Sequence, residues 1–339
     1  MKLVPVAKAV GMVLGHDVTK IVPGRFKGPA FKRGHVICQE DVRRLRDLGK
    51  ENIAALDLGA GWVHEDDAAL QLAKAAAGPG IQLSTPSEGK VNLIAASDGL
   101  LKINVIALNR INSVPDIIMA TLHTHQLVKE GQVVAGTRII PLTIRDEILR
   151  AGAVYGRPND PVVSIKPLQS HLVGVVTTGS EVYHGRIKDK FGPVVIKKVL
   201  SLGSRVLRQI YVPDDIDMSV AAIAALIDEG AKVVLITGGM SVDPDDLTPG
   251  SIRATGAEVI TYGAPVLPGA MFMLAYLGDI PIMGLPGCVM YHQTSIFDLV
   301  FPRILAGERL RREDIIAFGH GGMCLGCGDC RHPACGFGK

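Results

Sequence analysis

Short apolar runs alternate with helical repeats of apolar residues between positions 167 and 308. Residues 172–177 and 232–237 are mostly apolar runs that end in threonine, which is typical of buried strands. Residues 193–202 and 218–229 place apolar side chains at helical spacing, and a glycine follows each stretch. We expect further strands at 205–212 and 258–261, a hairpin of 271–276 with 280–283, and a last helix over about 290–305.

This alternation of strands and helices predicts the fold class. Strand–helix–strand units build a mostly parallel sheet with helices on both faces, so we expect an α/β domain over residues 167–308. In such sheets, ligands bind beyond the carboxyl ends of the strands. The loops that follow the strands are therefore the expected place for functional residues.

The remainder of the chain divides into three zones. Residues 1–80 mix short apolar runs with Gly-Pro turns and contain an Ala-rich helical stretch near 65–77. Residues 81–166 hold short β-branched runs, so we expect a β-rich module there; the runs lie at 91–95, 101–105, 117–121 and 133–141. These two zones form a smaller α+β or β-rich region before the α/β domain. Residues 309–339 are a linker and a Cys-rich tail.

Composition and charge exclude several classes of protein. A formal net charge of +3 is too small to indicate nucleic-acid binding, and the basic residues are not interleaved with aromatic ones. The N-terminal stretch is too short for the apolar core of about 7–15 residues of a secretory signal, because Gly11 interrupts it, and no run reaches the about 20 residues of a membrane span. We therefore expect a cytoplasmic protein, in which clustered cysteines indicate a metal site rather than disulfides.

Four loops of the α/β domain share an unusual composition: residues 177–181, 213–215, 237–246 and 284–288. Small residues and hydroxyls let backbone N–H groups approach a phosphate. Carboxylates cannot bind phosphate directly, but one or two of them can hold Mg²⁺ together with phosphate oxygens, or accept hydrogen bonds from a heterocycle. Together the loops describe a site for a phosphorylated heterocycle with a divalent ion.

These loops resemble a known family. Thr-Thr-Gly-Ser-Glu (177–181), Lys-Asp-Lys-Phe-Gly-Pro (188–193), Val-Pro-Asp-Asp (212–215), Thr-Gly-Gly-Met-Ser-Val (237–242) with Asp246, and Leu-Pro-Gly (285–287) are similar to the motifs of the molybdopterin-binding domain. That domain is shared by molybdopterin molybdenumtransferases and molybdopterin adenylyltransferases. The resemblance covers about residues 167–308, in the family's order and spacing.

The resemblance implies a set of site residues. The acidic positions serving Mg²⁺, molybdate or the pterin as catalytic residues would be Asp189, Asp215 and Asp246. The positions that bind the molybdopterin cofactor would be Thr178, Gly179, Ser180, Glu181, Asp214, Gly238, Gly239, Met240, Ser241, Asp243, Pro286 and Gly287. Relatives in this family are commonly oligomeric, so the resemblance also implies a homo-oligomer.

The start of the chain resembles the molybdenumtransferase type more loosely. Residues 10–18 are similar to its opening helix and turn, and residues 31–37 to a later stretch. Two departures occur in the α/β domain. The family's Lys-Pro-Gly-Lys element reads Leu267-Pro268-Gly269-Ala270 here, and the asparagine of its Pro-Gly-Asn loop is Cys288. Each lost cation would cost a bound oxyanion on the order of 1–4 kcal/mol, unless Lys188 or Lys190 substitutes.

The tail carries a second pattern of chemistry. Cys324, Cys327, Cys330 and Cys335 form C-x₂-C-x₂-C-x₄-C, with His332 among them. Thiolates at this spacing in glycine-rich backbone can converge on one metal. Zn²⁺ with four thiolates, or with three and His332, is the first interpretation. An iron–sulfur cluster is the second, because the spacing differs by one residue from a bacterial ferredoxin run. Free thiols or a thiol donor for molybdenum chemistry are further alternatives.

Two functions follow from these patterns. The leading hypothesis is molybdenum cofactor biosynthesis, in which the protein binds molybdopterin or its adenylylated form and assists molybdate insertion. The alternative is a non-catalytic carrier or chaperone that delivers the cofactor to a client molybdoenzyme. The missing lysine pair favours the carrier, whereas the acidic loop residues and the N-terminal resemblance favour the enzyme. A metal-dependent regulator fits less well, because the sequence shows no helix-turn-helix and no basic recognition surface.

Overall fold

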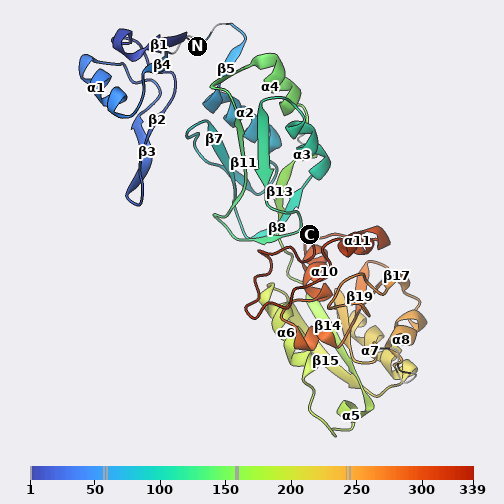
Figure 1. Cartoon of the computed structure of the whole chain (residues 1–339). Helices are drawn as coiled ribbons and strands as arrows, with labels where there is room; N and C mark the ends of the chain where they lie inside the picture. Colours follow the sequence, from blue (N-terminus) through green and yellow to red (C-terminus); the bar gives the residue numbers. More distant parts are fainter. Residues whose placement is uncertain (1, 56–57, 59, 157–159, 242, 244–245) are drawn as a thin grey trace. The chain divides into compact units, whose positions relative to one another are not determined.

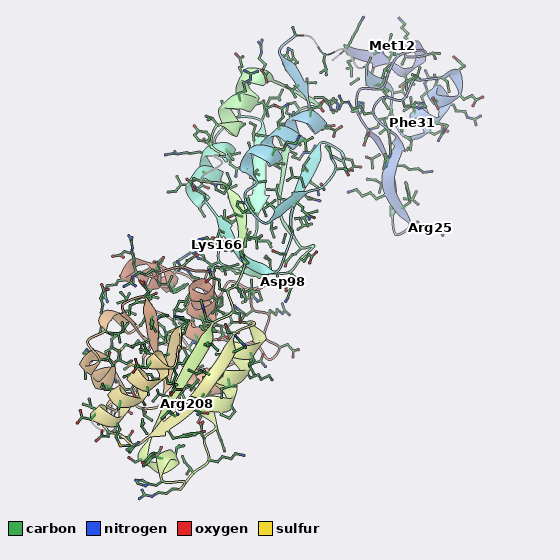
Figure 2. All side chains as sticks on the ribbon, turned by 180° about the vertical axis from the view of Figure 1, so that it is seen from behind. Met12, Arg25, Phe31, Asp98, Lys166 and Arg208 are labelled. Carbon is green, nitrogen blue, oxygen red and sulfur yellow. The ribbon has the colours of Figure 1, made fainter. Side chains whose placement is uncertain are left out.

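The computed structural model describes residues 2–55, 58, 60–156, 160–241, 243 and 246–339. The chain forms two compact units. One consists of Met1–Ser97, Lys102–Leu122 and Glu130–Ile165; the other consists of Asp98–Leu101, His123–Lys129 and Lys166–Lys339. Figure 2 labels Asp98 and Lys166, where two segments of the second unit begin. Within the described residues, no helix combines the length and hydropathy that a membrane crossing needs.

The second unit is built on a six-stranded sheet. Its strands are β14 (Leu172–Thr178), β15 (Arg205–Val212), β16 (Val233–Thr237), β17 (Glu258–Tyr262), β18 (Met273–Leu277) and β19 (Ile280–Leu285), in the order β15-β14-β16-β19-β18-β17. The first four of that order run parallel, and β18 is antiparallel to both of its neighbours. β15, which carries the Arg208 labelled in Figure 2, is an edge strand. The predicted mostly parallel α/β sheet is confirmed.

Helices cover both faces of this sheet (Figure 1). The helices of this unit are α5 (Ser180–Tyr183), α6 (Phe191–Ser201), α7 (Ile216–Asp228), α8 (Thr248–Ala254), α9 (Cys288–Tyr291), α10 (Ile296–Leu305), α11 (Arg312–Ile316) and the 3₁₀ turn η2 (Ala317–Gly319). Alternate strand residues face opposite sides, as in any pleated strand. Val233 and Leu235 pack with α6 and α10, whereas Val234 and Ile236 pack with α7 and α8. Two separate apolar layers therefore hold the sheet.

The carboxyl ends of the four parallel strands are aligned. Thr178 of β14 pairs with Val212 of β15, Thr177 with Thr237 of β16, and Thr237 with Leu285 of β19. The four loops singled out in the sequence thus leave the sheet at one edge. β18 runs the opposite way, so the segment that leads into it arrives at the same edge.

One predicted helix of this unit differs from the structure. The expected helix over about 290–305 is two helices, α9 and α10, separated at residues 292–295. α10 has its own start signal, because Asp298 accepts a hydrogen bond from the backbone N–H of Ser295 at 2.8 Å in a capping box. The prediction of one continuous helix was wrong because this Ser-x-x-Asp pattern was not weighed.

The N-terminal part of the first unit is a small mixed structure. It contains β1 (Lys2–Pro5), η1 (Val6–Lys8), β2 (Val18–Val22), β3 (Phe26–Phe31), α1 (Gln39–Asp47) and β4 (Asn52–Ala55). β1 pairs with β4, and β2 pairs with β3 as a hairpin. The expected helix in residues 10–18 is absent: Val13 and Leu14 instead make isolated bridges with Val36 and Ala55. The helical part of the N-terminal resemblance is therefore wrong.

The rest of the first unit is rich in strands. Its elements are β5 (Trp62–His64), α2 (Glu65–Ala76), β6 (Ile81–Leu83), β7 (Lys90–Ala95), α3 (Val105–Asn112), β9 (Ile117–Thr121), β11 (Val133–Ile139), β12 (Thr143–Arg145) and α4 (Asp146–Ala153). β6, β7, β11 and β9 form one antiparallel sheet, and α2 packs against β7 and β11. β8 (Gly99–Ile103) and β13 (Val163–Lys166) span boundaries between the units, and β10 (Leu127–Val128) belongs to the second unit. The predicted β-rich character is confirmed, although α3 and α4 were not foreseen.

The Cys-rich tail is part of the second unit. Phe337 is buried in the apolar cluster that also contains α10, and Cys324 and Cys335 pack against that cluster. A backbone bridge joins Met323 to Leu267. The tail is therefore a folded layer of this unit.

Candidate functional site

A cavity of about 530 Å³ lies at the carboxyl edge of the parallel strands. Three segments and one helix residue line it. After β16 come Gly238, Gly239, Met240, Ser241 and Asp246; before β18 come Leu267, Pro268, Gly269, Ala270 and Met271; at the end of β19 and beyond come Leu285, Pro286, Gly287 and Cys288; and α6 contributes Phe191. Seven of the predicted site residues are thus brought together: Gly238, Gly239, Met240, Ser241, Asp246, Pro286 and Gly287.

The two glycines after β16 are required by the local geometry. Gly238 has φ +91° and Gly239 has φ +56°, a backbone region that residues other than glycine rarely adopt. A Cβ at Gly238 would lie 2.3 Å from the carbonyl oxygen of Thr178. One at Gly239 would lie 2.7 Å from the hydroxyl oxygen of Thr248. These residues let the loop turn tightly against β14.

Hydrogen bonds of threonine hydroxyls hold this loop against β14 and α8. Thr177 and Thr237 share a hydrogen bond of 2.9 Å between their hydroxyls. The hydroxyl of Thr248 donates to the carbonyl oxygen of Gly238 at 2.9 Å and lies 3.3 Å from that of Thr178. Thr178 therefore supports the cavity wall and does not line it. Thr248 was missed in the sequence because α8, which it begins, was not predicted.

A second pair of loops is joined by polar contacts. The backbone N–H of Ser180 donates to a carboxylate oxygen of Asp214 at 2.9 Å, and the N–H of Asp214 donates to the Ser180 hydroxyl at 3.3 Å. Gly179 donates its N–H to the carbonyl of Val212 at 3.2 Å. These reciprocal bonds tie the loop after β14 to the loop after β15.

Two acidic residues of the predicted catalytic set accept hydrogen bonds from backbone N–H groups at the start of a helix. Asp215 caps α7 by accepting from the N–H of Met218 at 2.7 Å. Asp189 accepts from the N–H groups of Phe191 and Gly192 at 2.8 and 3.0 Å, and from the Gln209 amide at 2.7 Å. Neither side chain lines the main cavity. Their catalytic role stays a prediction.

A smaller hollow of about 280 Å³ is formed by residues of α5, β15 and the segment between α5 and α6. It is lined by Val182, Tyr183, Ile187, Asp189 and Tyr211. Burial, and then the neighbouring Asp189 carboxylate, raise the pKa of the Tyr211 phenol. The phenol therefore remains protonated at neutral pH and can act as a donor.

Asp246 is the predicted acidic residue that lines the main cavity. Its carboxylate accepts from the backbone N–H of Asp243 at 3.3 Å, and its own N–H donates to the carbonyl of Asp243 at 2.9 Å. Glu181 is exposed on α5. Val242, Pro244 and Asp245, which belong to the same loop, lie outside the described residues.

The lining of the main cavity contains no lysine or arginine among the described residues. Leu267 and Ala270 occupy the positions that the sequence comparison singled out, and neither Lys188 nor Lys190 is part of the wall. Cys288, the first residue of α9, adds no charge because burial raises the pKa of its thiol. Among the described residues that line the main cavity, Asp246 is thus the one with a charged side chain.

The four tail cysteines line a different cavity of about 540 Å³ in the same unit. His292 and His332 also contribute to it. Among the described residues, no group of three or more His, Cys, Asp or Glu side chains is drawn together closely enough to hold a metal ion as they stand. The four thiols thus line one cavity, as the sequence led us to expect. Among the described residues they do not form a metal-binding centre.

Two parts of the chain match models of protein families. Residues 174–306 match the family model described as "Probable molybdopterin binding domain". Residues 3–57 match a model described as a domain of unknown function. The first match spans the six-stranded sheet and the loops that line the main cavity, so this part of the chain is similar to molybdopterin-binding domains.

Individual proteins are similar to parts of this chain. The molybdopterin molybdenumtransferase of Bacillus subtilis is 27% identical over 159 residues, which is 45% of this chain and 34% of that protein. A CinA-like protein of Citrifermentans bemidjiense is 36% identical over 90 residues, 26% of this chain and 21% of that protein. The tungsten cofactor synthesizing protein MoaB from Pyrococcus furiosus superimposes with a TM-score of 0.35 and 21% identity, covering 42% of this chain and 98% of that chain. The matched region spans only about a third of the molybdenumtransferase.

Proposed function

We propose that this protein acts in molybdenum cofactor biosynthesis by binding molybdopterin, or its adenylylated form, in the main cavity and assisting molybdate insertion. One observation supports this most strongly: the four loops that resemble molybdopterin-binding motifs leave one edge of the parallel sheet, in register. The match of residues 174–306 to a molybdopterin-binding family supports the same ligand.

The glycine loop after β16 is suited to the phosphate of the pterin. Gly238, Gly239 and Ser241 line the wall, where backbone N–H groups and the Ser241 hydroxyl are available to an anion. Pro286 and Gly287 line the same cavity. We assign phosphate and pterin binding to these residues, with Thr178, Gly179, Ser180 and Asp214 supporting the loops.

Mg²⁺ is part of this proposal. The ion is usually held by one or two carboxylates together with phosphate oxygens and water, so a preformed protein cage is not needed. Asp246 offers such a carboxylate beside the glycine loop. Mg²⁺ there would also bring positive charge to a wall that has no lysine or arginine among its described residues, which is the charge a molybdate ion requires.

Turnover distinguishes this function from simple cofactor carriage. The full chain would be incubated with adenylylated molybdopterin, Mg²⁺ and molybdate, and AMP release and protein-bound molybdenum would be measured. We expect both to occur, and both to fall in Asp246→Asn. Tight binding of the pterin with no AMP release would contradict the enzymatic role and support a carrier that delivers to a client molybdoenzyme.

Three further features belong to the proposal. We propose that the tail cysteines hold a metal, either Zn²⁺ or an iron–sulfur cluster, since all four line one cavity. A cytoplasmic location fits this, because thiols stay reduced there. Assembly into a homo-oligomer and delivery to a client molybdoenzyme follow from the family resemblance and are tested by solution mass and by co-purification.

A further inference from the structure

The tail forms a loop that is closed at its base. The backbone N–H of Gly338 donates to the carbonyl oxygen of Gly321 at 2.9 Å. A Cβ on Gly321 would lie 2.4 Å from the carbonyl oxygen of Lys339, so the two ends of the loop are in close contact. Cys324, Cys327, Cys330 and Cys335 all lie between these ends. We call residues 321–338 the thiol loop.

Apolar packing does not account for the order of the thiol loop. A compact loop of this length is normally held by its own side chains. Here Met323 and Leu325 are 69% and 89% exposed. Phe337, which is 4% exposed, packs into the core of the second unit and anchors one end. Apart from Phe337, the large apolar side chains of the loop are therefore mostly exposed, although Met323 and Leu325 also line the cavity beside the thiols.

The polar groups of the cavity leave room for a bound group. The four thiols and His332 line the same space. The Nδ1 atom of His332 is buried without a hydrogen-bond partner in the described structure. The Cys330 thiol lies 3.1 Å from the hydroxyl of Thr294, which comes from the segment between α9 and α10. A buried ring nitrogen without a partner costs free energy unless a bound group supplies one.

We infer that the thiol loop binds a cubane iron–sulfur cluster through Cys324, Cys327, Cys330 and Cys335, with His332 beside it. A single zinc ion would gather the four sulfurs about 2.3 Å from one centre and would leave most of a 540 Å³ cavity unfilled. A cluster contributes its own sulfides, which fill space and hold the thiolates further apart. Its sulfides can also accept a hydrogen bond from the His332 ring.

Among the described residues, the thiols as they stand do not form a centre that holds a single metal ion. They surround the cavity but no three of them, with or without a histidine, are drawn to a single point in the described residues. Each thiol loses a proton when it ligates iron. A cluster of two ferrous and two ferric ions assembles without further oxidation when both ions are supplied together with sulfide. The inference does not depend on pterin binding, because metal content reports it directly.

Anaerobic reconstitution of the full chain tests the inference. One sample would receive equal amounts of ferrous and ferric iron, sulfide and a thiol reductant; a parallel sample would receive only Zn²⁺. We expect about four iron and four sulfide per chain, with broad visible absorption that disappears on oxidation. Retention of one zinc per chain against excess iron and sulfide would overturn the inference in favour of a zinc site, and binding of neither would overturn the metal site altogether.

Exposed thiols provide variants that keep the fold. Cys327 and Cys330 are exposed, so Cys327→Ser and Cys330→Ser remove ligands without opening the core. We expect each to lose most of the iron while its far-UV circular dichroism is unchanged. Cys38→Ser is the matched control, since Cys38 is an exposed cysteine of the first unit. Iron content that falls equally in Cys38→Ser, or that stays full in the two tail variants, would contradict the assignment.

Discussion

The backbone N–H of Cys324 donates a hydrogen bond of 2.8 Å to the carbonyl oxygen of Leu267. The N–H of Leu267 in turn donates to the carbonyl of Gly322 at 2.8 Å. Leu267 lines the main cavity, whereas Cys324 lines the thiol cavity. The wall of the proposed pterin site is therefore hydrogen-bonded directly to the tail, and order in one supports order in the other.

Removal of the tail's aromatic anchor should destabilise the second unit. Phe337 is buried in the apolar cluster of α10, so Phe337→Ala should cost about 3–5 kcal/mol of unfolding free energy. Leu325→Ala is the control, because Leu325 is 89% exposed and its loss should change stability by less than about 0.5 kcal/mol. Chemical denaturation measures both. Equal midpoints for the two variants would mean that the tail does not pack as described.

The glycine loop should not tolerate a side chain at Gly238. Gly238→Ala combines φ +91° with a Cβ 2.3 Å from the carbonyl of Thr178, so it should cost at least about 1–3 kcal/mol. Gly287→Ala is the matched substitution in the same cavity, because φ there is −53° and no atom lies within 4 Å of the new Cβ. Thermal unfolding should separate the two variants. A Gly238→Ala protein as stable as Gly287→Ala would disprove the geometric requirement.

Removal of Mg²⁺ should weaken pterin binding through Asp246. In the wild type, chelation with EDTA should raise the dissociation constant of molybdopterin by about tenfold, which is about 1.4 kcal/mol. Asp246→Asn should bind at that weaker level with or without Mg²⁺, because its amide no longer attracts the ion. Asp217→Asn, an exposed position in the first turn of α7, should keep the full response to Mg²⁺. A response retained in Asp246→Asn would place the ion elsewhere.

The N-terminal part of the chain should lose stability in acid through Asp41. Burial would raise the pKa of this carboxyl, but hydrogen bonds from the Cys38 thiol, the Cys38 N–H and His35 lower it to about 2. Because this lies below the value of 3.8 for a free carboxyl, ionised Asp41 stabilises the fold above pH 3.8. That contribution is lost as the pH falls towards 2.

The matched variant isolates this effect. Asp41→Asn cannot ionise, so the wild type should be more stable than the variant at neutral pH, and the difference should shrink as the pH passes from 3.8 to about 2. Thermal unfolding followed across that range measures the difference. A gap between the two proteins that is independent of pH would contradict the proposed ionisation.

The strands β14, β16, β18 and β19 could be predicted from continuous apolar runs because they are buried on both faces. The edge strand β15 is less buried, but it too was predicted. Residues 205–212 were predicted as a strand and form β15 with the same bounds. The helix α8 was missed because it contains Thr248, Pro249 and Gly250 in its first turn. Proline and glycine usually mark a loop. Proline is nevertheless compatible with the first turn of a helix, because N–H groups there make no hydrogen bond within the helix.

The site could be predicted only in part. Residue types in the loops indicated a phosphate and a divalent ion, and seven of the named residues do share a cavity. The sequence could not show that Asp215 caps α7 or that Asp189 receives two backbone N–H groups, because any carboxylate can serve a helix or a ligand. Nor could it show that residues 267–271 form a wall, which depends on the reversed direction of β18.

Occlusion of the main cavity tests the central claim most directly. Ser241 is an exposed residue of the cavity wall, so Ser241→Trp should fill the space without disturbing the core. Ser201→Trp places the same side chain at an exposed position at the end of α6, outside the cavity. Equilibrium titration with molybdopterin should give a dissociation constant raised at least about tenfold in Ser241→Trp and unchanged in Ser201→Trp. Identical affinities in wild type and both variants, or no binding by the wild type, would contradict the account.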